Sequence, residues 1–108
     1  MAFRVRILPR AKHDLETIYR RVIQESPLQG SDWYNGLQRS IYSLQDLPER
    51  CPVASKLSTQ TDLVRRLLYG TYPHVYKVYY HVIGNTVEIM HIRHGARREP
   101  KRRDLDKS

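Results

Sequence analysis

Residues 74–93 have the sequence HVYKVYYHVIGNTVEIMHIR, and this stretch decides the fold. Val, Ile and Tyr dominate both of its halves, which is typical of β-strands. Gly84-Asn85 separates the halves, and two such residues between strand-like runs predict the tight turn of an antiparallel hairpin. We therefore predict strands over residues 74–83 and 86–93. The second run is apolar on both alternating sides, which predicts a central strand whose far end is free to meet a partner.

The segments before this hairpin change their hydrophobic period twice. Residues 3–7 alternate apolar side chains with arginine, which predicts a half-buried strand. Apolar residues then recur every three or four positions over residues 11–25, and again from a helix start at Ser26-Pro27 to a stop before Pro48. These periods predict two amphipathic helices. A further strand is predicted at residues 63–69.

The order of elements is strand, two helices and three strands, which predicts an α+β domain. We expect an antiparallel-rich sheet with a helical hairpin packed on one face, because neither layer can bury its apolar side alone. Residues 48–62 are rich in Pro, Ser, Thr and charge without a period, which predicts a connecting loop. A chain of 108 residues is the usual size of one domain.

The charge balance is strongly basic. Nineteen Lys and Arg stand against eleven Asp and Glu, which gives a formal charge of +8. This balance predicts an acidic partner, such as nucleic acid or an acidic protein. A membrane partner has little support, because no apolar run approaches the roughly 18 residues of a spanning helix. Cys51 is the single cysteine and no signal peptide is visible, which fits a reducing, cytoplasmic setting.

The sequence lacks the signatures of several enzyme classes. It has no Gly-x-Ser-x-Gly elbow and no glycine-rich phosphate loop, which excludes conventional hydrolases and nucleotide-binding proteins. The single Cys51 excludes a cysteine-based zinc site. His91 and His94 lie three positions apart on a predicted strand, which sends them to opposite faces and argues against a metal pair. We therefore expect no metal and no cofactor.

Three tyrosines lie on the predicted strand at residues 74–83. Alternation places Tyr76 and Tyr80 on one face, which we expect to be core. Tyr79 then faces the other side together with Lys77 and His81. Such a mixed face is suited to stacking on nucleic-acid bases, although it is more commonly an ordinary half-buried sheet surface.

A basic segment follows the last predicted strand. It reads Arg93-His94-Gly95-Ala96-Arg97-Arg98. We expect Gly95 to let the backbone turn sharply after a buried strand. The three arginines would then be held on a rigid support, where planar guanidinium groups bind phosphate or carboxylate through paired hydrogen bonds. We expect the charges from Glu99 onward to be solvated and frayed.

Three blocks of sequence resemble the RelE/ParE superfamily of bacterial type II toxins, and more closely its ParE branch. They are PRAKHDLETIY at residues 9–19, IYSLQDLPER at residues 41–50, and residues 64–98 with the ending IRHGARR. The resemblance implies a β-α-α-β-β-β microbial RNase-like fold, in agreement with the order of elements predicted above. It also implies a toxin domain over residues 1–98 with a charged tail over residues 99–108, and a short antitoxin as partner in a hetero-oligomer.

The superfamily contains two activities. ParE-type toxins inhibit DNA gyrase, whereas RelE-type toxins cut messenger RNA in the ribosomal A site with basic residues and often a C-terminal tyrosine. Lys77 falls where RelE-type toxins place a catalytic arginine, and Arg97 or Arg98 falls near a second one. Nothing aromatic follows Arg98, however, and the His-Gly-Ala-Arg ending is similar to the ParE branch. The resemblance therefore favours gyrase inhibition without catalysis, with RNA cleavage as the alternative.

Under the ParE interpretation the functional site is a surface. The residues predicted to contact the target are Arg93, His94, Arg97 and Arg98. Trp33, Leu37 and Tyr42 are predicted to contact the antitoxin or the core. Two other classes stay open, namely a domain kept only as an antitoxin-binding or transcription-regulating partner, and a module that binds nucleic acid through charge alone.

Overall fold

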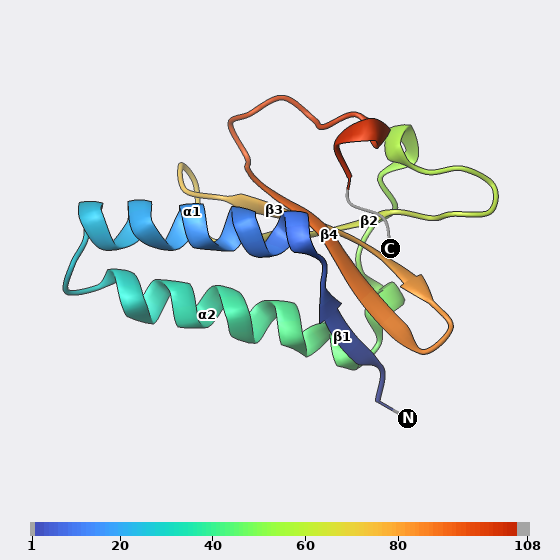
Figure 1. Cartoon of the computed structure of the whole chain (residues 1–108), viewed down its shortest axis with the longest axis horizontal. Coiled ribbons are helices and arrows are strands. Elements are labelled where there is room, and N and C mark those ends of the chain that lie inside the picture. The colour runs from blue at the N-terminus through green and yellow to red at the C-terminus, as the bar shows by residue number, and fades with distance from the viewer. Residues whose placement is uncertain (1, 106–108) are drawn as a thin grey trace.

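The computed structural model describes residues 2–105, and its elements follow the predicted order (Figure 1). The helices and strands are β1 (Arg4–Ile7), α1 (Pro9–Glu25), α2 (Gly30–Tyr42), β2 (Arg65–Tyr69), β3 (Tyr76–Ile83) and β4 (Thr86–His94). Short 3-10 turns lie at Ser43–Gln45, Pro48–Arg50, Ser55–Leu57 and Arg102–Asp104. The predicted α+β class and the β-α-α-β-β-β order are confirmed.

The strands form one mixed sheet in the order β1-β4-β3-β2. β4 pairs with β3 in antiparallel register and with β1 in parallel, so its prediction as a central strand is confirmed. The turn between β3 and β4 joins the paired residues Ile83 and Thr86, and Gly84 takes a φ of 61° there. A positive φ costs glycine least, because it has no Cβ.

The two helices lie antiparallel, side by side, and cover one face of the sheet (Figure 1). We call this the helix-covered face. Its core joins the apolar sides of α1, α2 and the strands, including Leu15, Ile18, Leu37, Ile41, Tyr76, Val78, Tyr80, Val87 and Ile89. The spacing of three and four in the helices and of two in the strands brings these residues together. The prediction that Tyr76 and Tyr80 belong to the core is confirmed.

Two glycines allow the second helix to pack closely. A Cβ at Gly30 would lie 2.9 Å from the carbonyl oxygen of Val22, and a Cβ at Gly36 would overlap the hydroxyl of Tyr69. That hydroxyl donates to the carbonyl oxygen of Trp33 at 2.8 Å. The predicted helix start at Ser26-Pro27 is wrong, because residues 26–29 form a connecting turn and α2 begins where Gly30 meets α1.

The opposite side of the sheet, which we call the second face, is also covered. Residues 48–62 and the segment after β4 pack on it. Its buried cluster contains Leu8, Ala54, Leu57, Val64, Tyr79, Met90 and Leu105. Tyr79 is fully buried, so the less favoured interpretation, in which Tyr79 stacks on nucleic-acid bases, is wrong. The alternation of residues along β3 predicted correctly that Tyr79 faces away from Tyr76 and Tyr80. The loop at residues 48–62 that covers Tyr79 has no periodic pattern, so its position could not be predicted.

The segment from Glu99 to Leu105 is folded onto this second face. Leu105 is 6% exposed, and Arg102 donates to the carbonyl oxygen of Leu57 at 2.6 Å and to Asp62 at 3.2 Å. The expectation of a frayed tail is therefore wrong for residues 99–105. Residues 106–108 lie outside the described part of the chain.

Candidate functional site

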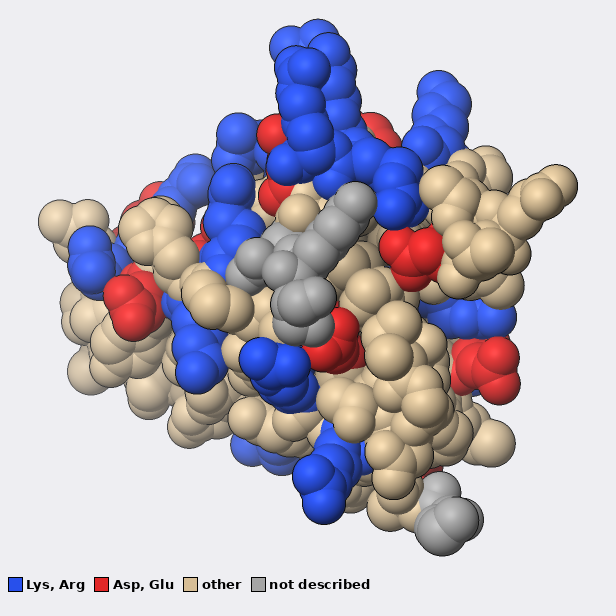
Figure 2. Space-filling view, turned by 45° about the vertical axis from the view of Figure 1, so that its right-hand side comes forward, with Lys and Arg blue, Asp and Glu red and all other residues tan. Residues whose placement is uncertain are grey.

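A groove of about 260 Å³ lies between α1 and the end of β4. Ile18, Tyr76 and Ile92 form its apolar floor. The cationic and imidazole side chains around it are Arg10, His13, Arg21, Arg93, His94 and Arg97. We call this the basic groove. In Figure 2, Lys and Arg side chains gather along the top of the molecule, over the segment that follows β4 in Figure 1.

Asp14 fixes α1 to the strand beside the groove. β1 pairs with β4 only as far as Ile7 and Ile89, so the edge of β4 beyond that point has no strand partner from β1. The Asp14 carboxylate lies there and accepts a hydrogen bond from the Ile92 N–H at 3.0 Å. A buried N–H without a partner is costly, so this single side chain replaces the missing strand bond.

The same carboxylate begins a chain of hydrogen bonds that reaches Arg93. Arg93 Nε donates to His91 Nε2 at 3.2 Å, so that nitrogen is an acceptor and the His91 proton lies on Nδ1. His91 Nδ1 donates to Asp14 at 2.7 Å. Arg93 Nη1 also donates to the carbonyl oxygen of Arg98 at 2.7 Å. The Arg93 guanidinium is therefore held in place from two sides.

Two ionisable groups of the groove have shifted pKa values. Burial alone would raise the pKa of the Asp14 carboxyl, but hydrogen bonds from His91 and the Ile92 N–H lower it by more, so this pKa lies below its ordinary value. Burial and the charge of Arg21 lower the pKa of His94. His94 is thus neutral at pH 7, and its Nδ1 accepts a hydrogen bond from the Ala96 N–H at 3.0 Å. The fixed positive charge of the groove comes from its arginines.

The structure brings together three of the four residues predicted to contact a target. Arg93, His94 and Arg97 line the basic groove, whereas Arg98 is exposed outside its described lining and contributes its carbonyl oxygen to Arg93. The predicted role of Gly95 needs a correction. Its φ is not positive, and its N–H donates to the Val75 carbonyl at 2.6 Å. A Cβ there would lie 2.8 Å from that oxygen, so close approach is the reason for glycine.

Lys77 lies apart from the groove floor. It pairs with Arg93 across β3 and β4, and alternation places it on the same side as Tyr79, the second face. Tyr76, its neighbour in sequence, contributes to the floor from the helix-covered face. Lys77 is not among the residues that line the basic groove.

The residues predicted to contact an antitoxin or the core differ in exposure. Leu37 is 0% exposed and belongs to the core, so its assignment to direct antitoxin contact is replaced by a structural role. Tyr42 is 48% exposed at the end of α2. Trp33 is half-buried. Its ring packs edge-to-face against the rings of Tyr69 and Tyr76, with a centroid distance of 5.2 Å in each case.

The histidines lie as their spacing predicts. The ring centroids of His94 and Tyr76 lie 5.0 Å apart, and those of the stacked rings of His91 and Tyr79 lie 6.3 Å apart. The two histidines therefore lie on opposite faces of the sheet. Within residues 2–105, no three His, Cys, Asp or Glu side chains gather in an arrangement that could hold a metal ion. In the same range no helix is both long and apolar enough to cross a membrane.

Sequence reasoning missed the contribution of α1. Arg10, Asp14, Thr17 and Arg21 recur at spacings of four, three and four, so they lie along one side of the helix and line the groove together. That polar stripe is visible in the sequence. Its meaning depends on α1 running along the free edge of β4, which the sequence does not reveal.

Comparison with solved structures shows which class of protein has this architecture. The chain is similar to a chain of the structure titled "Chromosomal ParDE TA system from P. aeruginosa", with a TM-score of 0.68 and 17% identity, covering 86% of this chain and 96% of that one. It is also similar to a double mutant of the E. coli toxin RelE in the free state, with a TM-score of 0.60 and 14% identity over 89% and 86% of the two chains. The fold is thus that of RelE/ParE-type toxins.

The sequence gives the family within this class. Residues 5–99 match the family described as ParE toxin of type II toxin-antitoxin system, parDE. The chain belongs to this family. A search of curated proteins found no match. The resemblance seen in the sequence is confirmed at the level of the superfamily and of its ParE branch.

Proposed function

We propose that this chain inhibits DNA gyrase by binding it through the basic groove, and that a cognate antitoxin neutralises it. The single observation that carries the proposal is the fixed Arg93. Its guanidinium is held by His91 and by the carbonyl of Arg98 at the side of a groove lined by three further arginines. Pre-positioned guanidinium groups suit carboxylates or phosphates, which an acidic protein surface and gyrase-bound DNA both offer.

The ParE family supports gyrase over messenger RNA as target. The position of Lys77 supports the same choice, because Lys77 does not line the basic groove with Arg97. One observation favours the RNA alternative, namely that Lys77 and Arg93 are direct cross-strand neighbours. Two cationic side chains on directly paired residues would suit a backbone phosphate of RNA.

The experiment compares both activities in parallel. Purified protein is titrated into a gyrase supercoiling assay and into a translation reaction in which message integrity is followed. We expect lost supercoiling with intact messages. The double variant R93A/R97A should need at least about tenfold more protein for the same inhibition, because truncating charged contacts at an interface costs several kcal/mol.

The matched control is R20A/R39A, which removes two exposed arginines outside the groove lining and leaves the net charge equal to that of the groove variant. Its inhibition should stay within about twofold of the parent protein, since exposed surface charges and their ion pairs contribute little. Message cleavage with normal supercoiling would overturn the proposal in favour of the RNA alternative. Equal loss in both double variants would indicate binding through net charge alone.

The antitoxin is tested separately in cells. The chain is induced alone and then together with the products of the neighbouring genes. Growth arrest that a neighbour relieves is the expected result. Unaffected growth on induction alone, with gyrase untouched in vitro, would identify an inactive member kept as a binding partner.

A further inference from the structure

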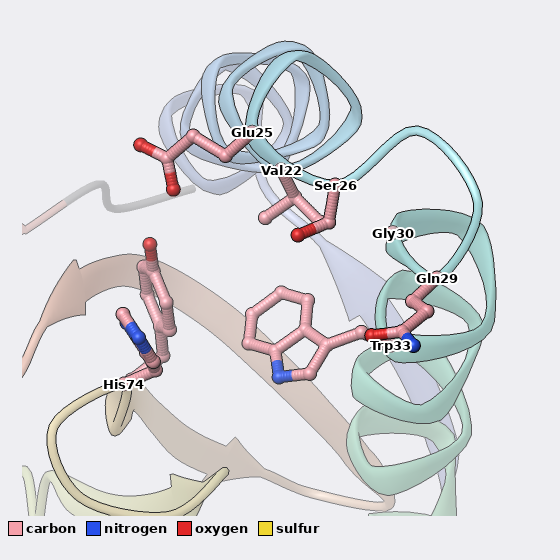
Figure 3. A pocket seen from close by; sticks show the side chains of 8 residues that line it. Val22, Glu25, Ser26, Gln29, Gly30, Trp33 and His74 are labelled. Carbon is pink, nitrogen blue, oxygen red and sulfur yellow. The ribbon is translucent and has the colours of Figure 1, made fainter.

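A second, smaller pocket opens at the far end of the helical hairpin. Its volume is about 160 Å³, and the end of α1, the start of α2 and the start of β3 surround it. Val22, Glu25, Gly30, Trp33, His74 and Tyr76 are among the residues that line it. Figure 3 shows Val22 and Ser26 projecting from the end of α1 toward the ring of Trp33. We call this the aromatic pocket.

The walls of the aromatic pocket are electron-rich rings. Trp33 and Tyr76 meet edge-to-face with centroids 5.2 Å apart, and a second edge-to-face contact at 5.2 Å joins Trp33 to Tyr69. These contacts hold the indole in place while it remains partly exposed. The face of an indole is the most favourable aromatic surface for a cation.

The charge of this pocket is opposite to that of the basic groove. Among its described lining residues, Glu25 is the only Asp, Glu, Lys or Arg. Its carboxylate pairs with Arg21 at 3.3 Å, but both side chains are 61% exposed. An exposed pair one helical turn apart contributes little to stability, so an incoming cation can share or replace it.

The size of the pocket limits its occupant. Sites for complete small ligands usually measure about 300–1,000 Å³, whereas this pocket holds about 160 Å³. It therefore fits a single side chain presented by a larger partner. An apolar side chain would desolvate Glu25 and the polar rim formed by Ser26, Gln29 and His74 without replacing their hydrogen bonds.

We propose that the aromatic pocket binds the guanidinium group of an arginine presented by a protein partner. A planar guanidinium can stack on the Trp33 ring and direct its N–H groups to the Glu25 carboxylate, which a compact ammonium cannot do equally well. Tyr76 lines both cavities, so they are neighbours. A partner segment that covers both would present arginine to the aromatic pocket and acidic side chains to the basic groove.

Trp33 is the single tryptophan of the chain, so its fluorescence reports on the pocket directly. The folded protein is titrated with N-acetyl-L-arginine amide and, separately, with the neutral isostere N-acetyl-L-citrulline amide. We expect a saturable change in emission with the arginine probe. The citrulline probe should bind at least about fivefold more weakly, because it lacks the charge that supports both the carboxylate and the ring contact.

The variant E25Q should weaken binding of the arginine probe about threefold to tenfold. The matched control is E16Q, which removes a carboxylate from the same helix, where Glu16 forms a comparable exposed pair with Arg20 at 3.8 Å. E16Q should bind within about twofold of the parent. Thermal unfolding of all three proteins confirms that they are folded, and the amide shift of Gly30 in NMR spectra gives a second signal from the pocket.

Three results would overturn the proposal. They are the absence of saturation by either readout, equal binding of the two probes, and equal weakening in E25Q and E16Q. The last result would mean that the cation responds to overall charge and not to the pocket. Because the test measures binding, its result does not depend on the target in the cell.

Discussion

The two faces of the sheet are covered in different ways. Two long amphipathic helices cover one face, and a core that includes Leu37, Ile41 and Ile89 holds them there. The second face is covered by short turns and by the segment after β4, over a smaller cluster around Tyr79 and Met90. Regular helices bury apolar area along their whole length, whereas the turns bury only single side chains such as Leu57.

Ion pairs and hydrogen bonds between charged side chains stabilise the second face in addition to its smaller apolar cluster. His81 lies between two carboxylates, with Nδ1 2.8 Å from Asp62 and Nε2 2.8 Å from Glu88. Arg102 extends this row to Asp62 at 3.2 Å, and Arg6 extends it to Glu88 at 3.1 Å. We call these five residues the charged clamp. The stability that the charged clamp contributes should therefore depend on pH, whereas the apolar contacts in the core of the helix-covered face should not.

The largest expected effect contrasts two buried leucines. Leu37→Ala on the helix-covered face should lower the free energy of unfolding by about 3–5 kcal/mol, because rigid helices and strands leave a cavity that cannot close. Leu57→Ala on the second face should cost about 2–3 kcal/mol, since its short 3-10 turn can move into the space. Urea unfolding with a common slope measures both values.

A loss at Leu57 equal to or larger than that at Leu37 would contradict this ranking of the two faces. The parent domain is expected to have only about 5–15 kcal/mol of stability in total, so Leu37→Ala can leave it partly unfolded. The milder pair Leu37→Val and Leu57→Val then provides the same comparison in folded proteins.

The second prediction concerns pH and the charged clamp. Burial alone would raise the pKa of Asp62, but the hydrogen bond and charge of His81, with help from Arg102, lower it by more, so this pKa lies below 3.8. A lowered pKa gives stability that is present above about pH 3.8 and is lost as pH falls through the folded-state value. Asp62→Asn should cost about 1–2 kcal/mol at pH 7. This cost should shrink as the pH falls below 3.8.

Urea unfolding at a series of pH values checks this result, with Asp46→Asn as control. Asp46 is exposed, and its substitution should change stability by less than about 0.5 kcal/mol at every pH. A cost of Asp62→Asn that is constant between pH 7 and pH 2 would show that the carboxylate contributes through shape and not through charge.

The sequence was sufficient to predict the helix-covered face. The periods of two and of three to four identified both layers and placed Tyr76 and Tyr80 in the core. The cover of the second face could not be predicted, because Leu57 and Leu105 are isolated apolar residues in polar segments. The bond between Arg102 and Asp62 joins positions 40 residues apart in the chain, and no local pattern predicts such a pair.

Only the part of the basic groove that follows β4 was predicted from the sequence. The sequence identified the cluster from Arg93 to Arg98, because these basic residues follow a strand predicted to be buried. The contribution of Arg10 and Arg21 requires knowing that α1 runs along the edge of β4 that β1 does not reach, where Asp14 replaces the strand. Topology, and not residue type, decides which polar side of a helix becomes part of a site.

The smallest expected effect compares two neighbouring tyrosines on opposite faces. The Tyr80 hydroxyl donates to the carbonyl oxygen of Pro48 at 2.5 Å, so Tyr80→Phe leaves a buried acceptor without its donor and should cost about 1 kcal/mol. The Tyr79 hydroxyl is buried near Arg66 and Glu99, but neither meets it with hydrogen-bond geometry. Burial raises the pKa of Tyr79 to about 12, so the group is neutral at pH 7.

Tyr79→Phe should therefore change the free energy of unfolding by less than about 0.5 kcal/mol, because the ring stays buried and no good hydrogen bond is lost. Urea unfolding of both variants at pH 7 measures the difference. A cost for Tyr79→Phe that matches Tyr80→Phe would show that the second face holds its polar groups as firmly as the helix-covered face. The charged clamp would then be one part of a well-packed core and not a substitute for it.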